Sequence, residues 1–387
     1  MKIAIICGRI PSTTFIENLI RGLANKDLKV LLIGKQKEKV AYKNKNIKNL
    51  GSGGRIKTFF FFQKYLVLLT LFKISHLFNL YSFSKKKNNS FYYFVSKYGS
   101  LLWNAPDIIH VQWAKQIEDW IWLENFGMRV VLSLRGTHIN TSPLSDHRLA
   151  KTYKTYFPNV AKFHCVSNAI KQIALQYYND SNSYIKIYSG VDLNRIKRIK
   201  IKKFFDKNNI SILSVGRDHW KKGYNYSILA ASLLKKEGVE FHYEIISEES
   251  EENNYLIDHL ELKDEVKFIG KLDYDDVLRK MESSDLLILP SVEEGIANVV
   301  LEAMAIGLPV ISTNCCGMSE VLEDGYNGIL INPRSPEEIF NAIKKYIDLS
   351  EPEKLKIRLQ AEKTIQSQHN LVDSINQFCE LYKELLS

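Results

Sequence analysis

The sequence has little cysteine, and its cysteines are not spaced as disulfide scaffolds or metal sites usually are. Its 387 residues contain five Cys, none of them in a Cys-x-x-Cys pair. A small disulfide-rich scaffold is therefore excluded, and free thiols in a reducing cytoplasm are the simplest interpretation. Hydrophobic residues make up 45% of the chain, so disorder is excluded as its main description. The length predicts two or three domains.

Long hydrophobic runs are also missing. The most apolar stretch, residues 59–83, is interrupted by Lys64, Lys73 and His76, and its longest run free of these residues is 65–72. A transmembrane helix needs about 20 mostly apolar residues, so we expect no membrane span. The first ten residues offer no small-residue cleavage site and are better explained as a buried strand than as a signal peptide.

Acidic residues are absent from one long segment. Twelve Lys or Arg and no acid lie between Glu38 and Asp107. The net charge of +10 divides into +22 for residues 1–200 and −12 for residues 201–387, which predicts two domains with different partners. Aromatic residues and Lys interleave through 55–103, as on a surface that lies on an anionic bilayer. Amphipathic core helices with a solvated Lys face explain this pattern equally well.

Short apolar runs alternate with helical patterns along the whole chain, which predicts parallel sheets. We predict two Rossmann-like, doubly wound α/β domains that face each other across a cleft. The first comprises residues 1–195 with a C-terminal helix of about 369–387, and the second comprises residues 205–368. The basic segment 193–208 is predicted to be a linker. The apolar runs are 2–7, 29–33, 107–111, 129–134, 162–166 and 185–188 in the first domain, and 210–215, 241–246, 265–269, 285–289, 309–312 and 328–331 in the second.

One segment of the second domain combines an anion site with two carboxylates. Strand 285–289 is followed by Glu294-Gly295 and a helix predicted to begin at Ile296, whose free N–H groups would bind an anion. Glu302 comes eight residues after Glu294, about 12 Å along a helix, so one carboxylate would meet a sugar and the other a ribose. By spacing alone, an ordinary amphipathic helix with two surface Glu is the favoured interpretation.

A second segment changes that balance. Arg217 follows strand 210–215 and Lys222 comes five residues later, so both cations are expected at the carboxyl edge of the same sheet. Arg and Lys bind phosphate oxygens, and together they would neutralise a leaving diphosphate. The neighbouring Lys221 is expected to be a solvated loop residue.

These segments resemble the family 4 retaining glycosyltransferases of the GT-B fold. The resemblance implies transfer of a sugar from a UDP- or GDP-linked donor to a hydroxyl of a lipid-linked or cell-surface glycan, as in lipopolysaccharide, capsule or exopolysaccharide biosynthesis. It also implies retention of the anomeric configuration, with no cofactor and no metal ion. The matching segments are GRDHWKKG (216–223), FIGKLDYDDV (268–277), SDLLILPSVEEG (284–295), VVLEAMAIGLPVIST (299–313) and VLEDGYNGILI (321–331).

The resemblance implies roles for single residues as well. Arg217 and Lys222 would bind the donor diphosphate, Glu294 would contact the transferred sugar, and Glu302 would contact the ribose. Arg217, Lys222 and Glu294 are the implied catalytic residues. The implied donor-binding set is Gly216, Arg217, Lys222, Glu294, Gly295, Ile296, Ala297, Asn298 and Glu302, with the backbone of Gly295 to Asn298 holding the distal phosphate.

The acceptor side departs from the family pattern. Many members have His-Gly-x-Asp where this chain has Arg135-Gly136-Thr137-His138. We therefore name Arg135, His138 and His110 as candidate acceptor-side residues, although a lone His at a strand end is more often structural. The triplet Asp273–Asp275 formally matches a metal-binding triplet of another glycosyltransferase fold, but its place before a helix favours a capping role. Glu320 matches an acidic family position without an assigned role.

Two alternatives remain open from the sequence. One is a nucleotide-sugar epimerase or hydrolase on the same fold, and the other is a non-catalytic basic protein that binds membranes. The pI near 9.1 invites a nucleic-acid partner, but no nucleic-acid module is recognisable, so none is expected. We expect a cytoplasmic protein with peripheral contact to the inner face of the plasma membrane through residues 55–103.

Overall fold

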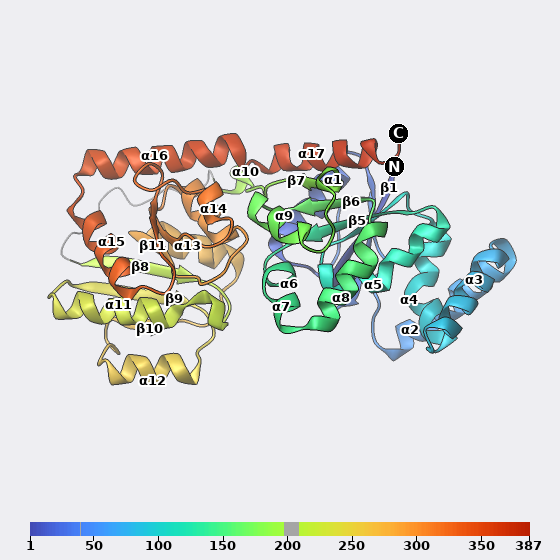
Figure 1. Ribbon diagram of the computed structural model, residues 1–387, viewed down its shortest axis with the longest axis horizontal. Helices are drawn as coiled ribbons and strands as arrows, with labels where there is room; N and C mark the ends of the chain where they lie inside the picture. The colour runs from blue at the N-terminus through green and yellow to red at the C-terminus, as the bar shows by residue number, and fades with distance from the viewer. Residues whose placement is uncertain (39, 197–208) are drawn as a thin grey trace. The chain divides into compact units, whose positions relative to one another are not determined.

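The computed structural model describes residues 1–38, 40–196 and 209–387 (Figure 1). Most of the predicted linker 193–208 therefore lies outside the described residues. The chain divides into two compact units. Unit 1 contains Met1–Cys165, Lys171–Ile187 and Ile375–Ser387, and unit 2 contains Val166–Ile170 and Tyr188–Ser374.

Unit 1 is built on a seven-stranded parallel sheet with the order β3-β2-β1-β4-β5-β6-β7. Its central strands are almost continuously apolar and buried, as expected of a parallel sheet covered on both faces. The strands are β1 (Lys2–Ile10), β2 (Lys29–Gln36), β3 (Ile47–Asn49), β4 (Ile108–Val111), β5 (Arg129–Leu134), β6 (Lys162–Cys165) and β7 (Tyr184–Lys186). The helices associated with this unit are α1 (Thr14–Asn25), α2 (Arg55–Phe72), α3 (Ile74–Lys86), α4 (Phe91–Asn104), α5 (Ile117–Trp120), α6 (Thr137–Asn140), α7 (Ser142–Ser145), α8 (His147–Tyr156) and the greater parts of α9 (Asn168–Leu175) and α17 (Leu371–Glu384).

Unit 2 has a six-stranded parallel sheet with the order β10-β9-β8-β11-β12-β13. Its strands are β8 (Ile210–Val215), β9 (Phe241–Ile246), β10 (Val266–Phe268), β11 (Leu286–Leu289), β12 (Val310–Thr313) and β13 (Ile329–Ile331). Its helices are α10 (Leu193–Ile196), α11 (Tyr224–Lys236), α12 (Glu251–His259), α13 (Tyr274–Ser283), α14 (Asn298–Ile306), α15 (Pro336–Asp348) and α16 (Glu351–Gln368).

The alternation of side chains along β11 explains why helices cover both faces of this second sheet. Leu287 and Leu289 belong to a core cluster with residues of α13, α14 and α16, whereas Leu286 and Ile288 belong to one with residues of α11, α12 and α15. Successive strand residues point to opposite faces, so an unbroken apolar run needs helices on both sides. Both units thus have the predicted Rossmann-like, doubly wound arrangement. In the described part of the chain, no helix has the length and apolar character to cross a bilayer.

A chain of buried polar side chains crosses the sheet of unit 1 and reaches α17. His164 Nε2 donates to the carbonyl of Ile187 at 2.9 Å, and its Nδ1 lies 2.8 Å from Ser133 Oγ. His110 Nε2 lies 2.8 Å from the same Ser133 Oγ, and its Nδ1 lies 2.6 Å from the Tyr382 hydroxyl. Because a carbonyl only accepts, neutral rings satisfy every bond if protons run from Tyr382 towards Ile187.

This arrangement contradicts the prediction that His110 lies on the acceptor side. Its side chain is 0% exposed, and both of its ring nitrogens are bonded within unit 1. An acceptor in solvent has no access to it. His110 instead links β4 to α17. This is the structural role that is more common for a lone histidine at a strand end.

We expect the stability of unit 1 to fall as the pH falls below about 6.5. Burial, and then the charge of Arg135, lower the pKa of His110 to about 3, and the same causes hold the pKa of His164 well below its usual value. The unfolded chain therefore binds protons that the folded chain cannot. His110 lowers the free energy of unfolding by about 1.4 kcal/mol per pH unit between roughly pH 6 and pH 4, and His164 acts in the same direction.

The measurement is urea unfolding followed by Trp fluorescence, since four of the five Trp belong to unit 1. His110→Gln should destabilise the unit at neutral pH and also reduce the pH slope by about one proton. His147→Gln, at an exposed histidine, is the matched control. An unchanged slope in His110→Gln would contradict the expectation.

Candidate active site

Two turns of unit 2 meet where the neighbouring strands β8 and β11 end. Gly223 has a φ of 65°, and a Cβ there would lie 2.2 Å from the carbonyl oxygen of Pro290. The amide of Val292 donates to the carbonyl of Lys221 at 2.7 Å. The turn that carries the predicted cations is therefore packed, backbone against backbone, on the turn that carries Glu294. This is the strand edge at which ligands bind in open parallel sheets.

A buried carboxylate joins these two turns. Lys222 Nζ donates to Glu294 Oε1 at 2.6 Å, and Lys221 Nζ lies 3.9 Å from Glu294 Oε2. The Glu294 side chain is only 12% exposed. Burial alone would raise the pKa of this carboxyl, but Lys222, Lys221 and Arg217 outweigh it, and the pKa is lowered from its usual value. Glu294 is thus held as a carboxylate among cations.

The structure corrects the prediction for Lys221. Its side chain is 9% exposed rather than solvated, and burial lowers the pKa of its ammonium group, while Glu294 acts in the opposite direction. Arg217 and the three residues after it are exposed. The site therefore contains the buried Lys221 and the partly buried Lys222 beside Glu294, and one exposed arginine at its rim. The Lys222 side chain packs closely on the backbone of Gly216, where a Cβ would lie 2.8 Å from Lys222 Cε.

Helix α14 begins two residues later than predicted. Asn298 is its first residue and Ala297 occupies the N-cap position, so Ile296 lies in the preceding turn. The amide of Ala297 donates to Met318 Sδ at 3.5 Å. A distal phosphate would have to compete with this weak bond for the Ala297 amide.

Glu302 lies one turn into α14 and has its own set of partners. Burial raises its pKa to about 7, although a hydrogen bond with Tyr274 and the charge of Arg195 act in the opposite direction. The Arg195 guanidinium stacks on the Tyr274 ring at 4.3 Å, and its Nε donates to Asp275 at 3.1 Å. The carboxyl of Glu302 is therefore poised between its ionised and neutral forms at neutral pH.

The acidic triplet supplies part of the surroundings of Glu302. Asp273 occupies the N-cap position of α13 as predicted, but its side chain makes no capping hydrogen bond. Asp275 pairs with Arg195, and Tyr274 reaches Glu302. Among the described residues, no three or more His, Cys, Asp or Glu side chains are grouped as a metal would require. Sequence reasoning missed Arg195 and Tyr274, although Tyr274 lies inside the triplet.

Gly317 packs against the Glu294 turn, and sequence reasoning missed it. A Cβ on Gly317 would lie 2.1 Å from the carbonyl oxygen of Gly295 and 2.8 Å from Ser167 Cβ. Glu320, whose role was unassigned, accepts hydrogen bonds from the amides of Asn168 and Ala169, both at 2.9 Å. It thus caps the start of α9 and fastens Val166–Ile170 within unit 2. In the sequence, the glycine that follows Cys315-Cys316 could have indicated this tight turn.

Arg135 and His138 lie together in unit 1, beyond the ends of β4 and β5. The Arg135 guanidinium stacks on Phe15 at 4.6 Å and donates to Gln112 at 3.3 Å, and burial lowers its pKa to about 10. The His138 ring lies 5.3 Å from the Trp113 ring. Both residues are partly exposed, so they are open to a ligand in a way that His110 is not.

Gly317→Ala tests whether the packing of the Glu294 turn matters. The added methyl would meet a backbone carbonyl, which cannot move without shifting Gly295. Such overpacking typically costs about 1–3 kcal/mol, and we expect UDP or GDP to bind at least about tenfold more weakly. Isothermal titration calorimetry measures the change. The matched control is Gly54→Ala, where a Cβ meets no atom within 4 Å; equal affinities in both variants would contradict the prediction.

Comparison with known proteins shows that part of the chain is similar to a family of glycosyl transferases. Residues 195–364 match the family described as Glycosyl transferases group 1. The chain is 30% identical over 230 residues to an uncharacterized glycosyltransferase of Methanocaldococcus jannaschii, covering 57% of this chain and 58% of that protein. It is 30% identical over 185 residues to the amylovoran biosynthesis glycosyltransferase AmsK of Erwinia amylovora, covering 46% and 45%. The chain thus spans about half the length of these curated relatives.

The fold has a close counterpart among solved structures. Anabaena HepE, solved in complex with UDP and glucose, matches with a TM-score of 0.74 over 99% of this chain and 100% of that one, at 18% identity. This likeness confirms the predicted GT-B fold with its two Rossmann-like domains. Residues 195–364, which carry Arg217, Lys222, Glu294 and Glu302, are thus similar to the glycosyl transferases group 1.

Proposed function

We propose that the protein is a glycosyltransferase of polysaccharide biosynthesis. It transfers a sugar from a UDP- or GDP-linked donor to a hydroxyl of a lipid-linked or cell-surface glycan, with retention of configuration and without a metal ion. The observation that carries the proposal is the buried Glu294 carboxylate held by Lys222 and Lys221 at the strand edge beside α14. The name of AmsK supports a polysaccharide acceptor, and the UDP and glucose bound to HepE support a nucleotide-sugar donor.

The charges of the site suit a diphosphate. Without a donor, Glu294 offsets part of the charge of Lys221 and Lys222, and Arg217 adds a third cation at the rim. A bound diphosphate would share these cations and free the Glu294 oxygens for the hydroxyls of the sugar. Cations already in place stabilise the charge that develops on the leaving group, because they need no reorganisation during the reaction.

The proposed reaction balances without another reactant. The bond between the anomeric carbon and the diphosphate oxygen breaks, and the acceptor oxygen bonds to the same face of that carbon. The proton of the acceptor hydroxyl passes to the departing phosphate oxygen. Lys222 and Arg217 hold the diphosphate in this step, Glu294 orients the sugar, and Glu302 binds the ribose.

Donor turnover tests the proposal. A thermal-shift screen of UDP- and GDP-sugars identifies the donor, because a ligand of the native state raises its stability. Arg217→Ala and Glu294→Gln should each lower kcat/KM on the order of 100-fold, whereas Lys236→Gln, at an exposed residue of the same unit, should not. NMR of the product should show the anomeric configuration of the donor, and EDTA should not affect the rate.

Unchanged turnover in both site variants would refute the assigned roles. Donor consumption at full rate in the absence of an acceptor would instead identify a hydrolase or an epimerase.

The pKa of Glu302 predicts a pH dependence of donor affinity. The ionised carboxylate accepts hydrogen bonds from both ribose hydroxyls, so affinity for the nucleotide sugar should rise between pH 6 and pH 8 as a group with a pKa of about 7 ionises. Calorimetric titration with the intact nucleotide sugar avoids the titration of a terminal phosphate. Glu302→Gln should bind more weakly and with a flat pH profile. A wild-type profile that is already flat would contradict the ribose role.

A further inference from the structure

Helix α2 has apolar side chains on every side, yet protein covers little of it. Of its 18 residues only Tyr65 and Leu69 are buried. A helix that is hydrophobic all round is normally enclosed by a protein core or by lipid. In Figure 1, α2 and α3 lie at the far edge of unit 1 with α4 as the helix next to them, and contacts join α2 to α3 and α4.

Exposed apolar side chains recur along both helices, and we call them together the α2–α3 face. Along α2, Ile56, Phe60, Val67 and Leu71 are spaced by four, seven and four residues and therefore share one side of the helix. Leu71 is 67% exposed. The α2–α3 face also includes Phe72 (69%), Ile74 (48%), Phe78 (68%) and Tyr81 (47%). Single exposed apolar residues are ordinary, but a patch of this extent marks an interaction site.

Basic residues lie among the apolar residues of the α2–α3 face, and acidic residues do not. Arg55, Lys57 and Lys64 line a surface hollow of about 630 Å³ together with Ile56, Phe60 and Phe61. Lys85 and Lys86 end α3. The sequence has no Asp or Glu between residues 39 and 106. Within the described residues, Arg55, Lys64, Lys85 and Lys86 form no ion pair, so these four charges are available to an anionic surface.

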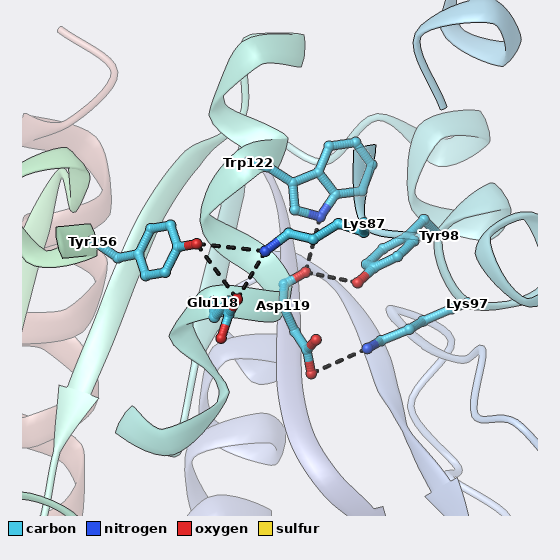
Figure 2. A network of polar contacts seen from close by, with 7 residues as sticks. All are labelled: Lys87, Lys97, Tyr98, Glu118, Asp119, Trp122 and Tyr156. Carbon is cyan, nitrogen blue, oxygen red and sulfur yellow. Dashed lines mark hydrogen bonds and ion pairs between the residues drawn. The ribbon is translucent and has the colours of Figure 1, made fainter. Parts of the chain in front are cut away.

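Other lysines of the same segment anchor it to unit 1, as Figure 2 shows. Lys87 pairs with Glu118 at 2.8 Å and Lys97 with Asp119 at 3.1 Å. The Trp122 indole donates to the carbonyl of Asp119 at 2.9 Å. The chain thus pairs its anchoring lysines with acids of α5 and leaves the lysines of the α2–α3 face unpaired. This division of charge is what a docked surface requires.

We propose that the α2–α3 face binds the surface of an anionic lipid bilayer. Aromatic and aliphatic side chains enter the headgroup boundary, while Lys and Arg stay at the level of the lipid phosphates. A second copy of the chain is the less suitable partner, because a two-fold contact through this face would bring cations against cations. The inference does not rest on the proposed function, since it concerns lipid binding in the absence of any donor or acceptor.

Flotation of the full chain with vesicles tests the proposal. We expect binding to phosphatidylglycerol vesicles, little binding to phosphatidylcholine vesicles, and a loss of binding as salt is raised. The triple variant Phe60→Ser, Leu71→Ser, Phe78→Ser should bind on the order of 100-fold more weakly because its apolar burial is lost. The variant Arg55→Gln, Lys64→Gln, Lys85→Gln should weaken binding by a similar factor.

Matched controls separate this face from general stickiness and charge. Leu144→Ser, Leu355→Ser, Leu359→Ser removes three other exposed apolar residues, and Lys236→Gln, Lys345→Gln, Lys363→Gln removes three exposed charges of unit 2. Both controls should bind vesicles as the wild type does. Every variant must keep the far-UV circular dichroism spectrum and the cooperative thermal unfolding of the wild type, which shows that it is folded.

Three outcomes would overturn the proposal. They are no binding to either vesicle, equal loss of binding in the control variants, and a dimer in analytical ultracentrifugation that the triple serine variant abolishes.

Discussion

The carboxylate of Glu294 is the point on which the candidate site depends. A buried charge is costly unless it is paired, and here Lys222 and Lys221 pair with it from the neighbouring turn. Pairing is achieved only because β8 and β11 are adjacent in the sheet and because Gly223 lets the two turns touch. The same backbone contact that allows the ion pairs to form brings the cations, the carboxylate and the start of α14 to one strand edge.

The two units handle buried polar groups in opposite ways. Unit 1 keeps His110 and His164 neutral in a closed chain of hydrogen bonds that ends at Tyr382 on α17. Unit 2 keeps Glu294 charged by pairing it with lysines at the strand edge. A closed network stabilises a fold, whereas an ionised group at a strand edge is suited to binding a ligand. This difference separates the histidine that holds a helix from the carboxylate that belongs to the candidate active site.

Much of the architecture was accessible from the sequence because it depends on local patterns. Unbroken apolar runs such as 285–289 predicted strands covered on both faces, and the core residues of β11 confirm it. The start of α14 was misplaced by two residues, because the chain continues through Ile296 in an extended turn that Met318 contacts from far along the sequence. The pairing of Glu320 with the start of α9 likewise joins residues about 150 positions apart, and no local pattern encodes such a contact.

By itself, the sequence determined the two α/β domains, the family resemblance and the residue types of the candidate site, since these follow from periodicity and from motifs of contiguous residues. Only the tertiary structure decided which of those residues are buried and which are paired. It placed Lys221 beside Glu294 and not in solvent, moved His110 into the core, and left Phe60, Leu71 and Phe78 exposed in a segment that reads as hydrophobic. The physical reason is that burial and charge pairing are properties of neighbours in space, and those neighbours come from strands and helices that are distant along the chain.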